Sequence, residues 1–181
     1  MSAAATGAVL LATSGKSEQK GKDRSGDRAK DQAKDQSKDQ SKAPWDYYEV
    51  LGTIAAVAGP DTPVFADMAI PGYWTAGFHA FARPRRLAYP VGWGTLGFAF
   101  PASLGAAAAG EGPVLCVCGD GGFLFACGEL ATAAQEELDV CVLVVDDGGY
   151  GMLRYDQARA GSPAFGVDLA APDWTGLAAA F

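Results

Sequence analysis

The chain has 181 residues, of which 49% are hydrophobic, and this is enough for one domain with a sizeable core. Its formal net charge is −7, and the part after residue 43 contains no lysine and fifteen acidic residues against five arginines. This balance argues against a surface that binds nucleic acid or anionic membranes. A phosphate group bound by this part needs a metal ion or backbone amides.

Residues 1–43 form a separate segment of low complexity. Residues 29–42 repeat a four-residue unit, AKDQAKDQSKDQSK, which spaces lysines along one helical stripe with no apolar residue to bury. Such a segment cannot offset the entropy of ordering by packing, so residues 1–43 are predicted to be a disordered, charged tail. SGKS at residues 14–17 is not a phosphate loop, because Leu10 stands where that motif requires its first glycine.

From residue 44 to residue 181 the sequence alternates between helix and strand patterns and is predicted to form one domain. The predicted helices cover residues 47–58, 73–81, 96–109 and 123–137, and the predicted strands cover residues 63–67, 86–89, 114–119 and 140–145. Apolar strands separated by helices indicate an α/β fold, with a parallel sheet that carries helices on both faces. Ligands of such sheets bind beyond the carboxyl ends of the strands.

Cysteine usage and hydropathy bear on the compartment. The four cysteines include no CxxC pair, and His79 is the single histidine, so a zinc site is not expected. Free, buried thiols suit a reducing cytosol. No apolar run reaches the roughly 20 residues that a membrane span requires. The sequence therefore predicts a cytoplasmic protein without a membrane segment.

Acidic and glycine residues gather where two neighbouring strands are predicted to end. GDGG follows the strand at 114–119, beginning with Gly119, and DDGG follows the strand at 140–145, beginning with Asp146. Carboxylates brought together there repel one another unless a cation lies between them, and oxygen ligands select magnesium or calcium. Glycines at a helix N-terminus leave backbone amides for a phosphate. The pattern predicts a metal–diphosphate site.

A dinucleotide-binding fold is the alternative. GWGTLG at residues 92–97 is a formal GxGxxG, and Asp120 follows Gly97 by 23 residues, near the position of a ribose-binding acid. The spacing leaves this reading open. It does not explain Asp146 and Asp147.

Three motifs together carry a resemblance to a known family. They are DMAIPGYW (67–74), YPVGWGTLGFAFPASLGAA (89–107) and GDGGFLFACGELATAAQEELDVCVLVVDDGGYG (119–151). The last resembles the thiamine-diphosphate-binding motif, in which a GDG is followed, at the spacing seen here, by a pair that is usually Asn-Asn. The chain from about Trp45 to Phe181 is similar to the C-terminal, diphosphate-binding domain of thiamine-diphosphate-dependent enzymes of the acetolactate synthase-like family.

The resemblance implies a role for particular residues. Side-chain oxygens of Asp120 and Asp147 and the carbonyl of Gly149 are expected to bind Mg²⁺. The carbonyl of Gly94 is expected to accept a hydrogen bond from the aminopyrimidine of the cofactor, and Leu96 to wedge between its two rings. The residues expected to bind the cofactor are Gly94, Thr95, Leu96, Gly119, Asp120, Gly121, Gly122, Tyr150, Gly151 and Met152.

The family pattern also implies an activity and a partner. The expected activity is that of a lyase or transferase, with decarboxylation of a 2-oxo acid and carboligation of the product. In the family, the activating glutamate lies on a pyrimidine-binding domain, normally of another subunit, and no such domain fits into residues 1–44. The chain is therefore expected to contain no catalytic residue, to need a partner in a homo- or hetero-oligomer, and to be incomplete at its C-terminal end. A non-catalytic cofactor-binding or oligomerisation fragment is the alternative.

Asp147 departs from the family, which has a neutral amide at this position. The extra negative charge beside a diphosphate leads to the hypothesis that the site holds metal at least as well and repels the cofactor more. Asp146 is expected to turn aside and hydrogen-bond its own loop.

Overall fold

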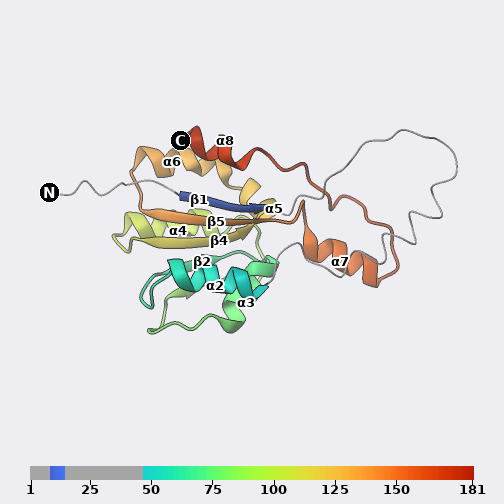
Figure 1. Cartoon of the computed structure of the whole chain (residues 1–181), viewed down its shortest axis with the longest axis horizontal. Coiled ribbons are helices and arrows are strands. Elements are labelled where there is room, and N and C mark those ends of the chain that lie inside the picture. The colour runs from blue at the N-terminus through green and yellow to red at the C-terminus, as the bar shows by residue number, and fades with distance from the viewer. Residues whose placement is uncertain (1–8, 15–46) are drawn as a thin grey trace.

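A computed structural model of the protein describes residues 9–14 and 47–181, apart from the side chains of residues 9–14, 47 and 49. The described residues contain a five-stranded parallel sheet in the order β1-β5-β4-β2-β3 (Figure 1). The strands are β1 (Val9–Ser14), β2 (Val64–Ala66), β3 (Leu87–Ala88), β4 (Val114–Gly119) and β5 (Val140–Asp146). The predicted α/β fold class is confirmed.

The edge strand β1 corrects part of the prediction for the N-terminal segment. It pairs along its whole length with β5, from Val9 opposite Cys141 to Ser14 opposite Asp146. The prediction assigns these six residues to the disordered tail, whereas they form a strand whose partners on β5 lie 132 positions further along the chain. A pairing over this distance depends on tertiary context rather than on the sequence of the segment alone. The other residues of the predicted tail lie outside the described residues.

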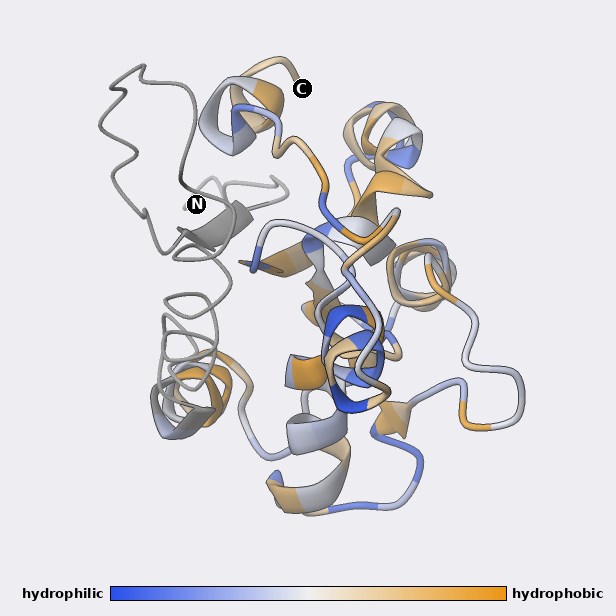
Figure 2. Ribbon diagram, turned by 90° about the vertical axis from the view of Figure 1, so that its right-hand side faces the viewer, coloured by the Kyte–Doolittle hydropathy of each residue, from blue (hydrophilic) through white to orange (hydrophobic). Residues whose placement is uncertain are grey.

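Helices cover both faces of the sheet. They are α2 (Tyr47–Val57), α3 (Ile70–Phe78), α4 (Ala99–Ala108), α5 (Asp120–Leu124), α6 (Leu130–Gln135), α7 (Gly151–Arg159) and α8 (Trp174–Ala179). Figure 2 shows helices around the strands, whose described residues are mostly hydrophobic. None of the helices in the described part of the chain is long and apolar enough to cross a membrane.

The side chains of the central strand β4 alternate between two cores. Cys116 and Cys118 are fully buried in the core that includes residues of α4, α6 and α8. Leu115 and Val117 point to the other core, which includes Ile54 of α2. This alternation is the period of two that a strand imposes, and it leaves both thiols as buried, free cysteines.

The predicted helix over residues 123–137 is divided in the structure. It consists of α5, a 3-10 turn at Cys127–Glu129, and α6. Helix α5 begins at Asp120, directly after β4, and therefore includes Gly121 and Gly122. Glycines weaken a helix in isolation, so the sequence pattern placed the start later, whereas here the end of the strand and the packing of buried Phe123 determine it.

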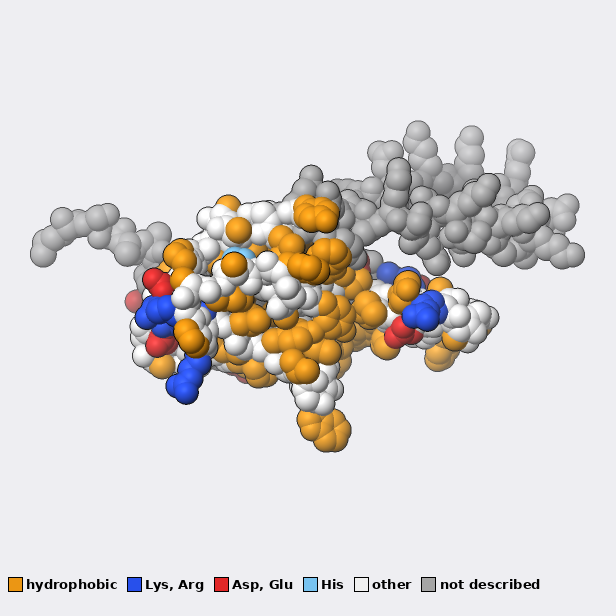
Figure 3. Space-filling view, turned by 90° about the horizontal axis from the view of Figure 1, so that it is seen from below, with side chains coloured by type: hydrophobic (Ala, Val, Ile, Leu, Met, Phe, Trp, Pro, Cys, Tyr) orange, Lys and Arg blue, Asp and Glu red, His pale blue; other side chains and the backbone are white. Residues whose placement is uncertain are grey.

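Several large hydrophobic side chains are exposed in the described region. Trp93 is 96% exposed, and Val91, Phe125 and Leu153 are also largely exposed. Figure 3 shows hydrophobic side chains gathered over the middle of one face. Contiguous exposed apolar surface of this kind marks an interaction or ligand-binding region.

Candidate functional site

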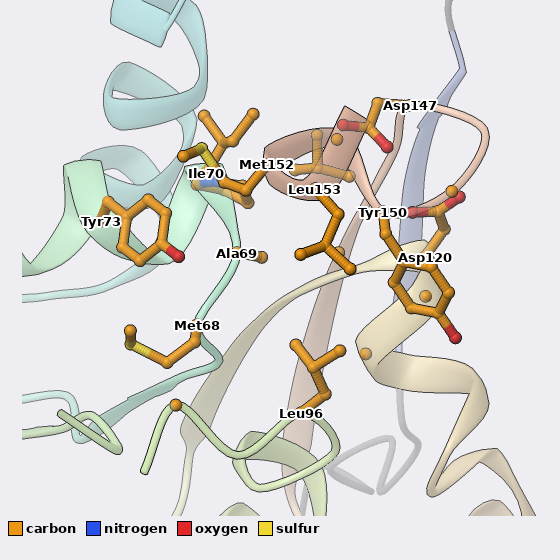
Figure 4. Close-up of a pocket in the computed structure, with 18 residues that line it drawn as sticks. Met68, Ala69, Ile70, Tyr73, Leu96, Asp120, Asp147, Tyr150, Met152 and Leu153 are labelled. Atoms are coloured by element: carbon orange, nitrogen blue, oxygen red, sulfur yellow. The ribbon is translucent and has the colours of Figure 1, made fainter. Parts of the chain in front are cut away.

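A pocket of about 310 Å³ opens at the carboxyl ends of β2, β4 and β5 (Figure 4). Its walls come from segments that are far apart in the sequence: the start of α3, the loop before α4, the β4–α5 turn, and the segment from the end of β5 into α7. The pocket is lined by Met68, Ala69, Ile70, Pro71, Tyr73, Gly94, Leu96, Gly119, Asp120, Gly121, Gly122, Val145, Asp147, Gly149, Tyr150, Gly151, Met152 and Leu153. This is the strand edge at which the sequence predicts ligand binding.

All of the residues expected to bind metal or cofactor line this pocket except Thr95, which is exposed beside it. Sequence reasoning assigned no role to the wall formed by Met68, Ala69, Ile70, Pro71 and Tyr73. The available signal was their position directly after a predicted strand, at the edge where ligands bind.

Two carboxylate oxygens in the pocket are buried without a hydrogen-bond partner. They are Oδ2 of Asp120 and Oδ1 of Asp147. Asp120, the first residue of α5, is only 1% exposed. A buried polar atom without a partner costs free energy, and a bound cation is one group that could satisfy both oxygens. In the described residues no cluster of three or more histidine, cysteine or acidic side chains could hold a metal ion by itself.

The pKa values of both Asp120 and Asp147 are raised in the pocket. Burial raises the pKa of Asp120 to about 6, and the charges of Asp147 and Asp146 add to this, while a hydrogen bond from the Gly121 amide opposes it. Burial also raises the pKa of Asp147, and the Arg154 guanidinium opposes that rise. A divalent cation would reverse both effects, because it favours the charged forms.

Asp146 is adjacent to Asp147, but both of its carboxylate oxygens have hydrogen-bond partners. Its Oδ2 accepts a hydrogen bond of 2.8 Å from Nε1 of Trp174, and its Oδ1 accepts one of 3.0 Å from the amide of Gly148. Both oxygens are thus used by the loop itself and by α8. This agrees with the expectation that Asp146 turns aside, and it ties the loop after β5 to the C-terminal helix.

The loop that carries Asp147 is held from its outer side. Nε of Arg154 donates to Asp168 at 3.0 Å, and Nη2 donates to the carbonyl of Gly148 at 3.1 Å. Gly149 forms an antiparallel bridge with Asp168 and has a φ of 144°, and a Cβ at Gly149 would lie 2.1 Å from the carbonyl oxygen of Val167. Only glycine fits here, because both the backbone conformation and the contact exclude a side chain.

The turn after β4 also needs glycine for close approach. A Cβ at Gly121 would lie 2.6 Å from the ring of Tyr150, and a Cβ at Gly122 would lie 2.6 Å from Oδ2 of Asp67. Bare backbone therefore forms this wall of the pocket, next to Asp120. Backbone amides at the start of a helix are suited to phosphate oxygens.

The raised pKa of Asp120 predicts a pH dependence of stability. Its pKa is 3.8 as the ordinary value and about 6 in the metal-free fold, so the folded protein holds a proton that the unfolded chain has lost between these pH values. The free energy of unfolding in EDTA should therefore fall as pH rises from about 4 to about 6, by no more than about 3 kcal/mol at 1.4 kcal/mol per pKa unit. Urea unfolding across this pH range measures it.

Asp120→Asn is the control for this prediction, because other acidic groups titrate in the same range. The variant should lack the part of the pH dependence that Asp120 contributes. Identical pH profiles for the two proteins would show that the pKa of Asp120 is not raised.

Comparisons with known proteins give a consistent picture. Residues 67–181 match the family model described as thiamine pyrophosphate enzyme, C-terminal TPP binding domain. The chain is 32% identical over 116 residues to the acetolactate synthase isozyme 1 large subunit of Escherichia coli (strain K12), covering 64% of this chain and 21% of the relative. It is 39% identical over 137 residues to the probable 2-ketoarginine decarboxylase AruI of Pseudomonas aeruginosa, covering 73% of this chain and 24% of the relative.

A solved structure shows the same fold. The thiamine diphosphate-dependent 4-hydroxybenzoylformate decarboxylase of Rhodococcus jostii RHA1 matches with a TM-score of 0.67 and 24% identity, over 75% of this chain and 26% of that chain. The present chain thus spans about a quarter of the length of these relatives. None of these matches supports the dinucleotide-binding alternative.

Proposed function

This chain belongs to the thiamine pyrophosphate enzymes, whose C-terminal TPP binding domain its residues 67–181 match, and we propose that it binds thiamine diphosphate through Mg²⁺ as part of an enzyme that acts on 2-oxo acids. The observation that carries the proposal is the pair of buried, unpartnered oxygens of Asp120 and Asp147 in one pocket. Acetolactate synthase and 2-ketoarginine decarboxylase relatives support the substrate class.

We assign the polar end of the pocket to the metal and the diphosphate. Asp120, Asp147 and the carbonyl of Gly149 would hold Mg²⁺, and diphosphate oxygens and water would complete six oxygen ligands, which is the coordination that Mg²⁺ prefers. The backbone of Gly121 and Gly122 would receive the diphosphate. The chemistry of the donors fits, because carboxylate and carbonyl oxygens are hard ligands.

The apolar end of the pocket is suited to the cofactor rings. Figure 4 shows Met68 and Leu96 on the side of the pocket away from the carboxylate of Asp147, with Leu153 near the centre and Met152 beside Ile70. Gly94 would accept a hydrogen bond at its carbonyl, Thr95 would border the ring, and Leu96 would set the bend between the rings. Bound thiamine diphosphate supplies the carbanion stabilisation that decarboxylation and carboligation need. The residues of this chain hold it in place and exclude water.

A partner domain is a further part of the proposal. No glutamate of the described residues lines the pocket, and we assign the activation of the cofactor to a pyrimidine-binding domain of another chain, in a homo- or hetero-oligomer. The exposed apolar residues Val91, Trp93 and Leu153, which belong to or flank segments that line the pocket, support such a partner. Lyase or transferase activity would then belong to the assembly.

The second candidate is a cofactor-binding module without turnover. The observation that favours it is that, within residues 9–14 and 47–181, the pocket is lined by no glutamate. Turnover restored by a pyrimidine-domain partner would favour the enzyme. Binding without turnover under any pairing would favour the module.

Calorimetry of thiamine diphosphate on the full chain, with Mg²⁺ and with EDTA, tests the proposal. We expect binding with Mg²⁺ and a loss of at least about tenfold in affinity with EDTA, because the diphosphate would then face two carboxylates directly. Binding that is absent, or independent of the metal, would refute the proposed function.

Asp147→Asn tests the hypothesis about the extra charge. The amide keeps an oxygen ligand and removes one negative charge beside the diphosphate, so thiamine diphosphate affinity at saturating Mg²⁺ should stay the same or rise by a few fold, about 1 kcal/mol at most. Calorimetry under identical conditions measures it. A sharp fall in cofactor affinity would contradict the hypothesis.

A further inference from the structure

Asp67 is a buried carboxylate that does not line the pocket, although it directly precedes the residues that do. It follows β2 and is 1% exposed. Its Oδ1 accepts hydrogen bonds from the amides of Phe98 at 2.9 Å and Ala99 at 2.7 Å. Its Oδ2 accepts one from the amide of Gly97 at 3.1 Å.

These amides belong to the N-terminus of α4, which has no side-chain cap from its own N-cap residue, Phe98. The first amides of a helix have no partner within the helix and must be satisfied from outside. Asp67 supplies that partner from about 30 residues away in the chain. It therefore holds the start of α4 and, with it, the end of the loop that contributes Gly94 and Leu96 to the pocket.

Asp67 also contacts the opposite wall. A Cβ at Gly122 would lie 2.6 Å from Oδ2 of Asp67, so the carboxylate packs directly against the β4–α5 turn. An independent contact joins the same two segments, because a Cβ at Gly97 would lie 2.7 Å from Cβ of Phe125 and 3.4 Å from the carbonyl oxygen of Gly122. One side chain thus lies between the wall assigned to the cofactor rings and the wall assigned to the diphosphate.

We propose that Asp67 is a positioning residue that sets the spacing of these two walls through the amides of Gly97, Phe98 and Ala99. The identity of the ligand in this inference rests on the proposed function. The role of Asp67 in the spacing of the two walls does not depend on the proposed function.

The chemistry requires aspartate rather than a neutral analogue. Three N–H donors point at the two carboxylate oxygens of Asp67, so every contact is with an acceptor. Asparagine would place an NH₂ group against at least one of these donors, and a buried donor without an acceptor is costly. Charge-assisted hydrogen bonds to backbone amides are also stronger than neutral ones.

Hydrogen exchange of Asp67→Asn in the cofactor-free full chain is the first measurement. We expect the amides of Gly97, Phe98 and Ala99 to exchange about tenfold faster or more, together with those of the turn at residues 119–122, while the core strands change less. Thiamine diphosphate affinity should fall by about tenfold or more, because the two walls must be brought back into register on binding. Mg²⁺ affinity without the cofactor should change less than the cofactor affinity does.

Ser103→Ala is the matched control. Ser103 lies on the same helix and is fully buried, and its hydroxyl donates to the carbonyl of Phe100 at 2.6 Å, away from the pocket. Ser103→Ala should lower overall stability without selectively accelerating amide exchange at residues 97–99 and without weakening the binding of thiamine diphosphate. The proposal is overturned if Asp67→Asn accelerates exchange evenly, as this control does, or if cofactor affinity is unchanged while residues 97–99 exchange rapidly.

Gly122→Ala provides a second route if Asp67→Asn does not fold. The new methyl group would push on Oδ2 of Asp67 and should speed exchange at Gly97, Phe98 and Ala99, none of which hydrogen-bonds to residue 122. Unchanged exchange there would refute the positioning role. If the parent chain does not bind thiamine diphosphate, the proposed function fails, while the exchange measurements still decide whether Asp67 couples the two walls.

Discussion

Asp120→Asn should weaken the binding of thiamine diphosphate in the presence of Mg²⁺ by roughly 100-fold, since changes even to residues that only support metal ligands cost about 10- to 100-fold. Asp120 is almost completely buried, so little water screens its charge. The charge of Asp147 is partly balanced by Arg154, which opposes the rise in the pKa of that carboxyl that burial causes. Asp120 therefore contributes most of the uncompensated negative charge that a cation would meet. Calorimetry at fixed Mg²⁺ measures the loss.

The control for this variant is Asp61→Asn, which also removes one carboxylate. Asp61 is exposed, pairs with Arg83, and lines a polar cleft that does not share residues with the main pocket. Exposed ion pairs contribute little, so this change should leave binding within about threefold. If Asp120→Asn bound the cofactor as well as Asp61→Asn does, Asp120 would not be a metal ligand.

Gly149→Ala should destabilise the fold by about 3 to 5 kcal/mol, the sum expected for a strained backbone and a steric overlap. The φ of 144° is one that side chains rarely adopt, and the new Cβ would lie 2.1 Å from the carbonyl oxygen of Val167 and 3.0 Å from the amide of Leu169. Relief of this overlap would separate Gly149 from its bridge partner Asp168 and displace the carbonyl that we assign to Mg²⁺. Urea unfolding and a Mg²⁺-dependent cofactor titration measure the two effects.

The neighbouring Gly148→Ala is a closely matched control. Gly148 also has a positive φ, of 78°, but a Cβ there would meet nothing within 4 Å. Its cost should be about 1 to 2 kcal/mol, which is the penalty for a left-handed residue alone. Equal effects of the two alanines would show that the contact with Val167 does not constrain the loop.

The two carboxylates of the candidate site could be found from the sequence because parallel strands end at a common edge. Asp120 and Asp147 each follow an apolar strand, so the topology alone brings them into one pocket. The resemblance places Thr95 among the cofactor residues together with Gly94 and Leu96, yet Thr95 is exposed and does not line the pocket. Which of three consecutive loop residues face inward depends on the backbone of the loop, where Gly94 has a φ of 63°.

Asp67 shows what local patterns do not reveal. Its carboxylate oxygens accept hydrogen bonds from amides about 30 residues away, so nothing in its sequence neighbourhood indicates that it caps a helix. The same holds for Asp146, whose partner on α8 is Trp174, 28 residues away. Both are contacts between segments that meet only after the sheet has formed.

By itself, the sequence determined the α/β class, the bounds of β4, and the strand edge where the acidic and glycine residues collect, because hydrophobic periodicity and strand polarity are local properties. Tertiary structure alone decided that Val9–Ser14 completes the sheet beside β5, that α5 begins at Asp120, and that one buried carboxylate lies between the two walls of the pocket. These features depend on strand pairing and burial between segments that are distant in the sequence. The free energy of such contacts cannot be estimated from a local sequence pattern.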